Sequence, residues 1–193
     1  MASTYSSNTG IELITTGEQS GTWGDTTNTN LNIIDRALNG VGTIDLSGSA
    51  AAHTLTTSDG TLSDGMFKVL VLDGATEACT ITIAPNDADK VYLVYNNSGE
   101  SCVFTQGSGG NVTIADGDTK VIYANGAGGG AAVADFTANL AMSSVNITGG
   151  SVTGITDLAV ADGGTGASTV SAAQTNLQVD PAGTAVALAI ALG

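Results

Sequence analysis

Short apolar runs separated by turn residues recur along the middle of the sequence, and they restrict the chain to a mainly β fold. In one run, Cys79, Ile81 and Ile83 alternate with two threonines, which is the pattern of a half-buried strand. Glycine, asparagine and aspartate fill the breaks, as tight turns require. We expect strands at residues 66–72, 79–84, 91–95, 102–106, 112–115 and 120–124. Their close spacing predicts an antiparallel β-sandwich or jelly-roll-like domain over residues 43–136.

One of these expected strands, residues 91–95, is apolar at every position. Val91, Leu93 and Tyr95 alternate with Tyr92 and Val94. Strands with two apolar faces are typical of sheets that are covered on both sides. We therefore expect this strand to be covered on both faces.

An amphipathic helix is expected ahead of the strands, within residues 17–40. Leu31, Ile34 and Leu38 fall at i, i+3 and i+7 and form an apolar stripe, which Ile33 and Ala37 widen. Two uses of the stripe remain open, since it can pack on the chain's own sheet or dock on a partner.

If the helix docks, residues 1–42 form an attachment segment that is separate from the β domain. The helix is expected to begin near Asp25, Thr26 and Thr27, whose side chains can accept from free backbone N–H groups. The side chains that would then be buried against a neighbouring chain or an adaptor protein are Trp23, Leu31, Ile34 and Leu38.

Residues 137–193 hold too few large side chains to build a globular core. Isolated apolar residues stand among glycine, serine and threonine, and three identical chains side by side could bury them as a thin seam. The residues of this seam are Val145, Ile147, Val152, Ile155 and Leu158. They predict a homotrimer with a slender, intertwined trimeric β stalk.

Two further features of this segment carry expectations. Gly163, Gly164 and Gly166 predict a tight turn, after which Ser168 can cap a short helix. In residues 185–192 larger apolar residues alternate with alanine, which predicts a strand with two apolar faces buried against other chains.

The charge of the chain excludes several partners. The formal net charge is -14, and the basic residues are Arg36, Lys68, Lys90 and Lys120. A nucleic-acid surface needs clustered cations, so no nucleic acid is expected. No apolar run has the length of a transmembrane helix, so no membrane insertion is expected.

The two cysteines, Cys79 and Cys102, each lie in an expected strand among apolar neighbours. This setting favours buried free thiols over a disulfide. The cysteines lack CxxC spacing and the chain has a single histidine, so we expect neither a metal nor a cofactor.

Residues that could carry catalysis are sparse. Asp87 with Asp89, and Asp116 with Asp118, are paired in turns, where a solvated role is favoured over glycan cleavage. His53 is the single candidate base, and no obvious nucleophile lies beside it. We therefore expect no enzymatic activity.

Two segments resemble the fibre proteins of bacteriophages. Residues 147–177, ITGGSVTGITDLAVADGGTGASTVSAAQTNL, look like a fibre shaft module in which a GGTGA turn precedes a small-residue helix. Residues 16–40, TGEQSGTWGDTTNTNLNIIDRALNG, are similar to the N-terminal module of fibre-like virion proteins of marine phages, such as cyanophages and pelagiphages. The chain departs from the shaft module at Gln178, where a glycine is usual.

The resemblance implies a structural virion protein, a homotrimeric tail fibre or fibre connector that is assembled in the host cytoplasm. It implies that the N-terminal module anchors the fibre to another virion protein, a tail adaptor or a capsid protein, and that the fibre supports host adsorption. A capsid (head) fibre or decoration protein and a glycan-binding receptor module, which would contact a host surface glycan, are the alternatives.

Overall fold

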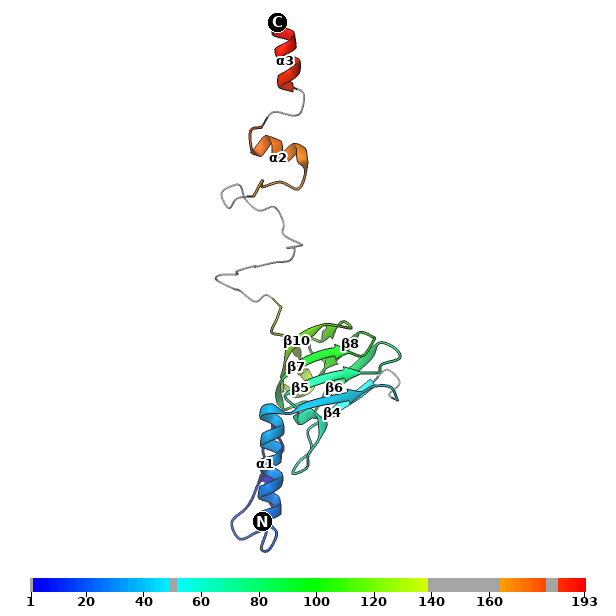
Figure 1. Cartoon of the computed structure of the whole chain (residues 1–193). Helices are drawn as coiled ribbons and strands as arrows, with labels where there is room; N and C mark the ends of the chain where they lie inside the picture. The colour runs from blue at the N-terminus through cyan, green and yellow to red at the C-terminus, as the bar shows by residue number, and fades with distance from the viewer. Residues whose placement is uncertain (1, 49–51, 139–163, 180–183) are drawn as a thin grey trace. The chain divides into compact units, whose positions relative to one another are not determined.

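The structure, a computed structural model, describes residues 2–48, 52–138, 164–179 and 184–193. The chain divides into two units, Met1–Ala141 and Met142–Gly193. The described residues contain three sheets and three α-helices (Figure 1), so the mainly β prediction is confirmed.

The elements of the first unit follow one another closely. In chain order they are β1 (Thr4–Tyr5), β2 (Glu12–Leu13), α1 (Trp23–Asn39), β3 (Val41–Asp45), β4 (Ala52–Thr56), the 3-10 turn η1 (Asp64–Met66), β5 (Val69–Asp73), β6 (Cys79–Ala84), β7 (Asp89–Asn97), β8 (Cys102–Thr105), β9 (Val112–Ile114), β10 (Thr119–Asn125), the 3-10 turn η2 (Gly128–Gly130) and β11 (Val133–Asp135). The second unit contains α2 (Val170–Asn176) and α3 (Thr184–Leu192).

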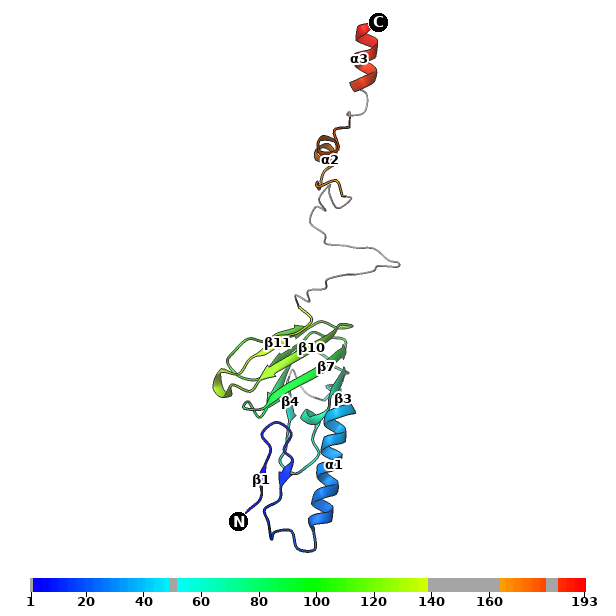
Figure 2. The same cartoon turned by 90° about the vertical axis from the view of Figure 1, so that its left-hand side faces the viewer.

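Two sheets of the first unit pack face to face (Figures 1 and 2). One has five strands in the order β11-β10-β7-β5-β3, and the other has four in the order β4-β6-β8-β9. The pairs β3–β5, β5–β7, β4–β6 and β6–β8 are parallel, whereas the pairs that involve β9, β10 and β11 are antiparallel. The prediction of an antiparallel sandwich is therefore wrong for most of the domain.

The parallel pairing follows from how the chain moves between the sheets. It visits the five-stranded and the four-stranded sheet in turn, so that β3–β4, β5–β6 and β7–β8 are three successive coils. Val41 pairs with Val69, and Val69 pairs with Leu93. The chain therefore returns to the same level of the five-stranded sheet, one strand further along, after 28 and then 24 residues. Because each coil enters a sheet in the same direction, neighbouring strands run parallel.

Alternate residues of both sheets point inward and form the core. Leu70 and Leu72 from one sheet and Ile81 and Phe104 from the other are fully or almost fully buried. Tyr92 is buried with them, and its hydroxyl donates to the Gly65 carbonyl at 2.7 Å, which satisfies its polar end.

Cys79 and Cys102 form a disulfide, so the prediction of free thiols is wrong. The two residues lie directly opposite each other in the parallel pair β6–β8, and both side chains face the core. Their Cα atoms are 4.7 Å apart, a separation that a disulfide spans. Their separation of 23 residues along the chain matches one coil of the sandwich.

The helix α1 begins at Trp23, earlier than predicted, and its N-cap is Thr22. Asp25, Thr26 and Thr27 therefore lie inside the first turns. The reason is a backbone turn at Gln19, whose carbonyl accepts from the N–H groups of Thr22 and Trp23 and so starts the helix.

The two helices of the second unit agree with the sequence in one case and differ in the other. α2 lies where a short helix was expected, but Thr169, rather than Ser168, caps it by accepting from the Ala172 N–H at 3.2 Å. Residues 184–192 form α3 rather than the predicted strand. Alanine and leucine are the best helix formers, and here their propensity outweighs the alternation.

Candidate attachment surface

The β1–β2 hairpin is fastened to α1 through the side chain of Asn30. Its amide oxygen accepts from the Glu12 N–H at 3.0 Å, and its amide nitrogen donates to the Glu12 carbonyl at 2.9 Å. Asn30 thus bonds to β2 as a neighbouring strand would. The pairing holds the hairpin alongside the helix (Figure 2).

A second fastening is made by Gln19, which adopts the left-handed conformation with φ of 62°. Its amide nitrogen donates to a Glu12 carboxylate oxygen at 2.6 Å, while its amide oxygen accepts from the hydroxyls of Thr22 and Thr26 at 2.9 Å each. The hairpin, the Gln19 turn and the first two turns of α1 are therefore joined by hydrogen bonds. We refer to these parts together with the rest of α1, residues 2–39, as the head.

The opposite end of α1 is joined to the sandwich through Phe67. The Arg36 guanidinium lies 4.4 Å from the centre of the Phe67 ring and donates to the Ser63 carbonyl at 3.1 Å. Gly42 lies against the same ring, where a Cβ atom would approach a ring carbon to 2.2 Å. Ile33, on the same helix, is fully buried.

The face of α1 that packs on its own chain is therefore formed by residues such as Asn30, Ile33 and Arg36. The residues singled out from the sequence lie elsewhere: the exposed fractions are 63% for Trp23, 57% for Leu31, 39% for Ile34 and 65% for Leu38. This exposed stripe does not cover the chain's own sheet. Because burial of large apolar side chains away from water is favourable, the stripe is a candidate docking surface.

The head is also tied to the sandwich by Lys90 on β7. Its ammonium group donates to the Asn8 carbonyl, and the Asn8 side-chain oxygen accepts from the Asp89 N–H at 3.0 Å. Burial lowers the pKa of Lys90 from its ordinary value of 10.5 to about 8, because the charged form is poorly solvated there.

We expect the free energy of unfolding to rise between pH 8 and pH 10. The folded protein releases the Lys90 proton near pH 8 and the unfolded chain near pH 10.5, so the cost of burying the charge disappears across that interval. The gain is up to about 3 kcal/mol at 1.36 kcal/mol per pKa unit. Urea unfolding at several pH values measures it, with Lys90→Met as the variant that lacks the titrating group and exposed Lys68→Met as the control. Identical pH dependence in the wild type and Lys90→Met would contradict this expectation.

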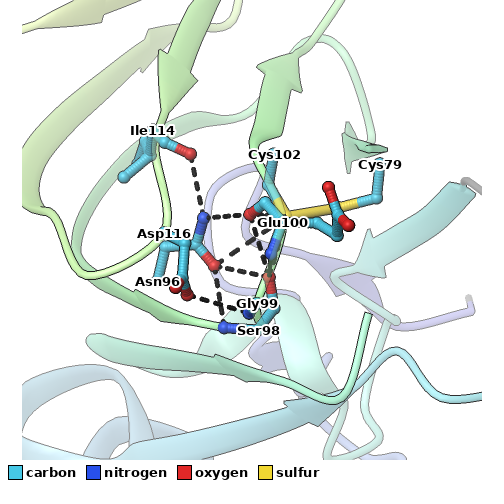
Figure 3. Close-up of a disulfide and its surroundings, with 8 residues drawn as sticks. All are labelled: Cys79, Asn96, Ser98, Gly99, Glu100, Cys102, Ile114 and Asp116. Carbon is cyan, nitrogen blue, oxygen red and sulfur yellow. Dashed lines mark hydrogen bonds between the residues drawn. A yellow bond between two sulfur atoms is a disulfide. The ribbon is translucent and has the colours of Figure 1, made fainter. Parts of the chain in front are cut away.

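Three of the residues considered for catalysis, His53, Asp89 and Asp116, have structural partners. His53 Nε2 and an Asp64 carboxylate oxygen are 2.8 Å apart, and the other Asp64 oxygen accepts from the Thr56 N–H at 2.8 Å. Asp89 accepts from the Tyr123 hydroxyl, and Asp116 accepts from the Gly99 N–H in the turn beside the disulfide (Figure 3). Among the described residues, no three His, Cys, Asp or Glu side chains are grouped so that they could hold a metal ion.

The remaining residues singled out from the sequence belong to the second unit. The five seam residues Val145, Ile147, Val152, Ile155 and Leu158, and also Gly163, lie outside the described residues. Gly164 and Gly166 are described, and Gly166 has a φ of 63°, in the region that favours glycine.

No helix in the described parts of the chain is long and apolar enough to cross a membrane. Comparisons of the chain with protein-family models, with curated proteins and with solved structures found no match.

Proposed function

We propose that the protein is a structural component of a phage virion, a homotrimeric tail fibre or fibre connector that is anchored to the particle by its N-terminal head. The observation that carries the proposal is the exposed stripe of Trp23, Leu31, Ile34 and Leu38 on a helix whose other face is already bonded to its own chain. The resemblance of residues 16–40 and 147–177 to fibre modules is the reason for proposing a phage virion as the particle.

The organisation of the head supports an anchoring role. The head is held rigid by Asn30, Gln19 and Lys90, so that ordering the stripe for docking costs little conformational entropy. The partner in this proposal is another virion protein, a tail adaptor or a capsid protein. A capsid fibre or decoration protein would use the same stripe, and electron microscopy of particles that carry a labelled protein distinguishes the two positions.

Replacing Leu31 and Leu38 together with glutamate is expected to remove the protein from phage particles. Burying one leucine contributes roughly 1.5–3 kcal/mol, so loss of both should lower the copy number per particle by at least about tenfold. Since both side chains are exposed, the melting temperature of the isolated protein should stay close to that of the wild type.

The matched control for this experiment is Asn28→Glu, an exposed polar position on the same helix. It adds a carboxylate without removing an apolar side chain, and particles should carry it at the normal copy number. Normal incorporation of the Leu31→Glu/Leu38→Glu double variant would refute the anchoring proposal.

A glycan-binding receptor module is the second candidate, because sugar rings stack on exposed aromatic rings. Phe136 is 55% exposed and stacks on Tyr123 with ring centres 5.6 Å apart. Binding of the full chain to a glycan array, lost on Phe136→Ala, would favour this candidate over a purely structural role.

A further inference from the structure

The outward face of the five-stranded sheet carries a continuous apolar row. In the register of the strands, Phe136 lies opposite Val121, Val121 opposite Leu93, Leu93 opposite Val69 and Val69 opposite Val41. The row runs from Phe136, the residue that follows β11, across β10, β7 and β5 to β3. Its two ends are the most open, with Val41 at 61% and Phe136 at 55% exposure.

Neighbouring rows extend this apolar face on both sides. Tyr95 lies opposite Val71 in one direction, and Val91 lies opposite Tyr123 in the other. In Figure 2 the strands of this sheet lie toward the viewer, in front of β4. We refer to the outward side of β3, β5, β7, β10 and β11 as the open face.

The open face explains a difference between sequence and structure at β7. The pattern of residues 91–95 predicts cover on both sides, yet Val91, Leu93 and Tyr95 are each 38–39% exposed in the single chain. A strand that is apolar on both faces is typical of a sheet buried on both faces. The outward apolar side chains of β7 are therefore left partly exposed by the described part of the chain.

The outward face of the four-stranded sheet has a different composition. The residues that point to solvent there are mostly threonines: Thr54, Thr56, Thr80, Thr82, Thr105 and Thr113. Hydroxyl groups keep their hydrogen bonds to water, so this face has no comparable need of a partner. Of the two outward faces, the open face is therefore the candidate contact surface.

Charge favours contact between open faces over contact elsewhere on the molecule. The chain carries a net charge of -14, so two copies repel each other in general. The outward acids of this sheet, Asp45, Asp73 and Asp89, stand at strand ends, and the rows between them are uncharged. Two copies can therefore meet over these rows without burying an unpaired charge.

The size of the open face fits a shared interface. Five strands about 4.8 Å apart and five residues of about 3.3 Å each give a face of about 400 Å². A stable interface takes roughly 800 Å² from each partner, so the open face can supply about half of it. In a fibre, the seam predicted at Val145–Leu158 is a second region of the same chain that three copies would share.

We propose that copies of this chain associate through the open face, and that this face forms the part of the homotrimer interface that lies within the first unit. The proposal rests on the proposed function, because it names the surface by which the subunits of that fibre meet. A second copy presents the same apolar, uncharged surface, and in a three-fold ring one part of the open face of each copy meets a different part of the open face of the next copy.

Replacement of Leu93 with glutamate in the full-length chain tests the proposal. Three copies would then bring carboxylates together in an apolar contact, and the dissociation constant of the oligomer should rise at least about tenfold in native mass spectrometry and sedimentation. Thr80→Glu, at an exposed position of the other sheet, is the matched control and should leave the oligomer unchanged. An oligomer of Leu93→Glu with wild-type affinity would overturn the proposal.

Thiol labelling of Leu93→Cys gives a second readout that does not depend on weakening the assembly. The introduced thiol should react with a maleimide at least about tenfold more slowly than that of Thr80→Cys at concentrations where the oligomer persists, and should become reactive on dilution. Rapid labelling within an intact trimer would overturn the open-face proposal and leave the trimeric fibre standing. A monomer at every concentration would instead remove the trimer itself.

The other occupants of the open face have distinct outcomes in the same experiments. Protection of the introduced thiol of Leu93→Cys in a monomer would mean that another segment of the chain covers the face. Protection that appears only when a glycan is added would assign the face to receptor binding. Either result would overturn the proposal.

Discussion

Replacing Asn96 with leucine is expected to lower the free energy of unfolding by about 3–5 kcal/mol. Asn96 is fully buried, and its side chain makes four hydrogen bonds (Figure 3). The amide nitrogen donates to the carbonyls of Glu100 and Ile114 at 2.8 and 2.9 Å, and the amide oxygen accepts from the N–H and hydroxyl of Ser98 at 3.2 and 2.7 Å. Leucine has a similar volume but leaves these groups unpaired, at roughly 1–3 kcal/mol for each one that water cannot reach.

Chemical unfolding of the full chain measures this effect, and Asn97→Leu is the control. Asn97 is the next residue on β7 but points outward and is exposed, so its replacement should change stability by less than about 0.5 kcal/mol. An Asn96→Leu variant with the wild-type unfolding midpoint would show that the turns after β7 and β9 do not depend on this amide.

Removal of the disulfide by Cys79→Ala together with Cys102→Ala is expected to cost about 3 kcal/mol. The bond closes a loop of 23 residues, and in the chain-entropy account a loop of this length loses roughly that much stabilisation when it opens. Both cysteines face the core, so replacing them with alanine also removes buried sulfur atoms and slightly lowers the free energy of unfolding through lost packing.

Reductant provides the internal control for the disulfide. The reduced wild type and the double alanine variant should unfold at similar denaturant concentrations, and reductant should leave the double variant unchanged. If reductant has no effect on the wild type, the bond does not form in solution and the two thiols are free.

The sequence predicts the strands of this fold better than their pairing. Alternation along residues 79–84 marks β6 with the bounds that the structure shows, because period-two burial follows directly from strand geometry. The same alternation says nothing about which strand lies beside β6, or in which direction it runs. That depends on the passage between the two sheets, which long irregular links such as residues 57–68 make, with η1 within them.

The disulfide could not be located from the sequence alone. The chain returns to the neighbouring strand after 23–28 residues, and the return of 23 residues places Cys79 opposite Cys102, but this coil length is visible only once the parallel register is known. The error at α3 has another source. Alternating alanine and larger apolar residues satisfy both a strand pattern and a helix propensity, and the local pattern cannot rank the two.

The sequence locates the apolar residues of α1 but does not tell which of them face inward. Leu31, Ile33 and Ile34 all belong to the apolar side expected from the sequence, yet Ile33 alone is buried. The reason is that α1 contacts its own chain mainly through polar groups, above all the two bonds between Asn30 and Glu12. Pattern analysis assumes that the apolar side of a helix faces the core of its own chain. Here the β1–β2 hairpin packs on a different side of α1, the side that carries Asn30.

Because the chain coils between the two sheets, the width of the sandwich can change by one strand per sheet for each coil. Each coil adds one strand to each sheet, and β3, β5 and β7 lie side by side for this reason. Insertion of one further coil would therefore widen both sheets by one strand each and leave the existing strand register unchanged. The antiparallel strands β9, β10 and β11 would close the last pass as they do now. Duplication of a segment of roughly two dozen residues would therefore widen the sandwich without any change in how the head is held.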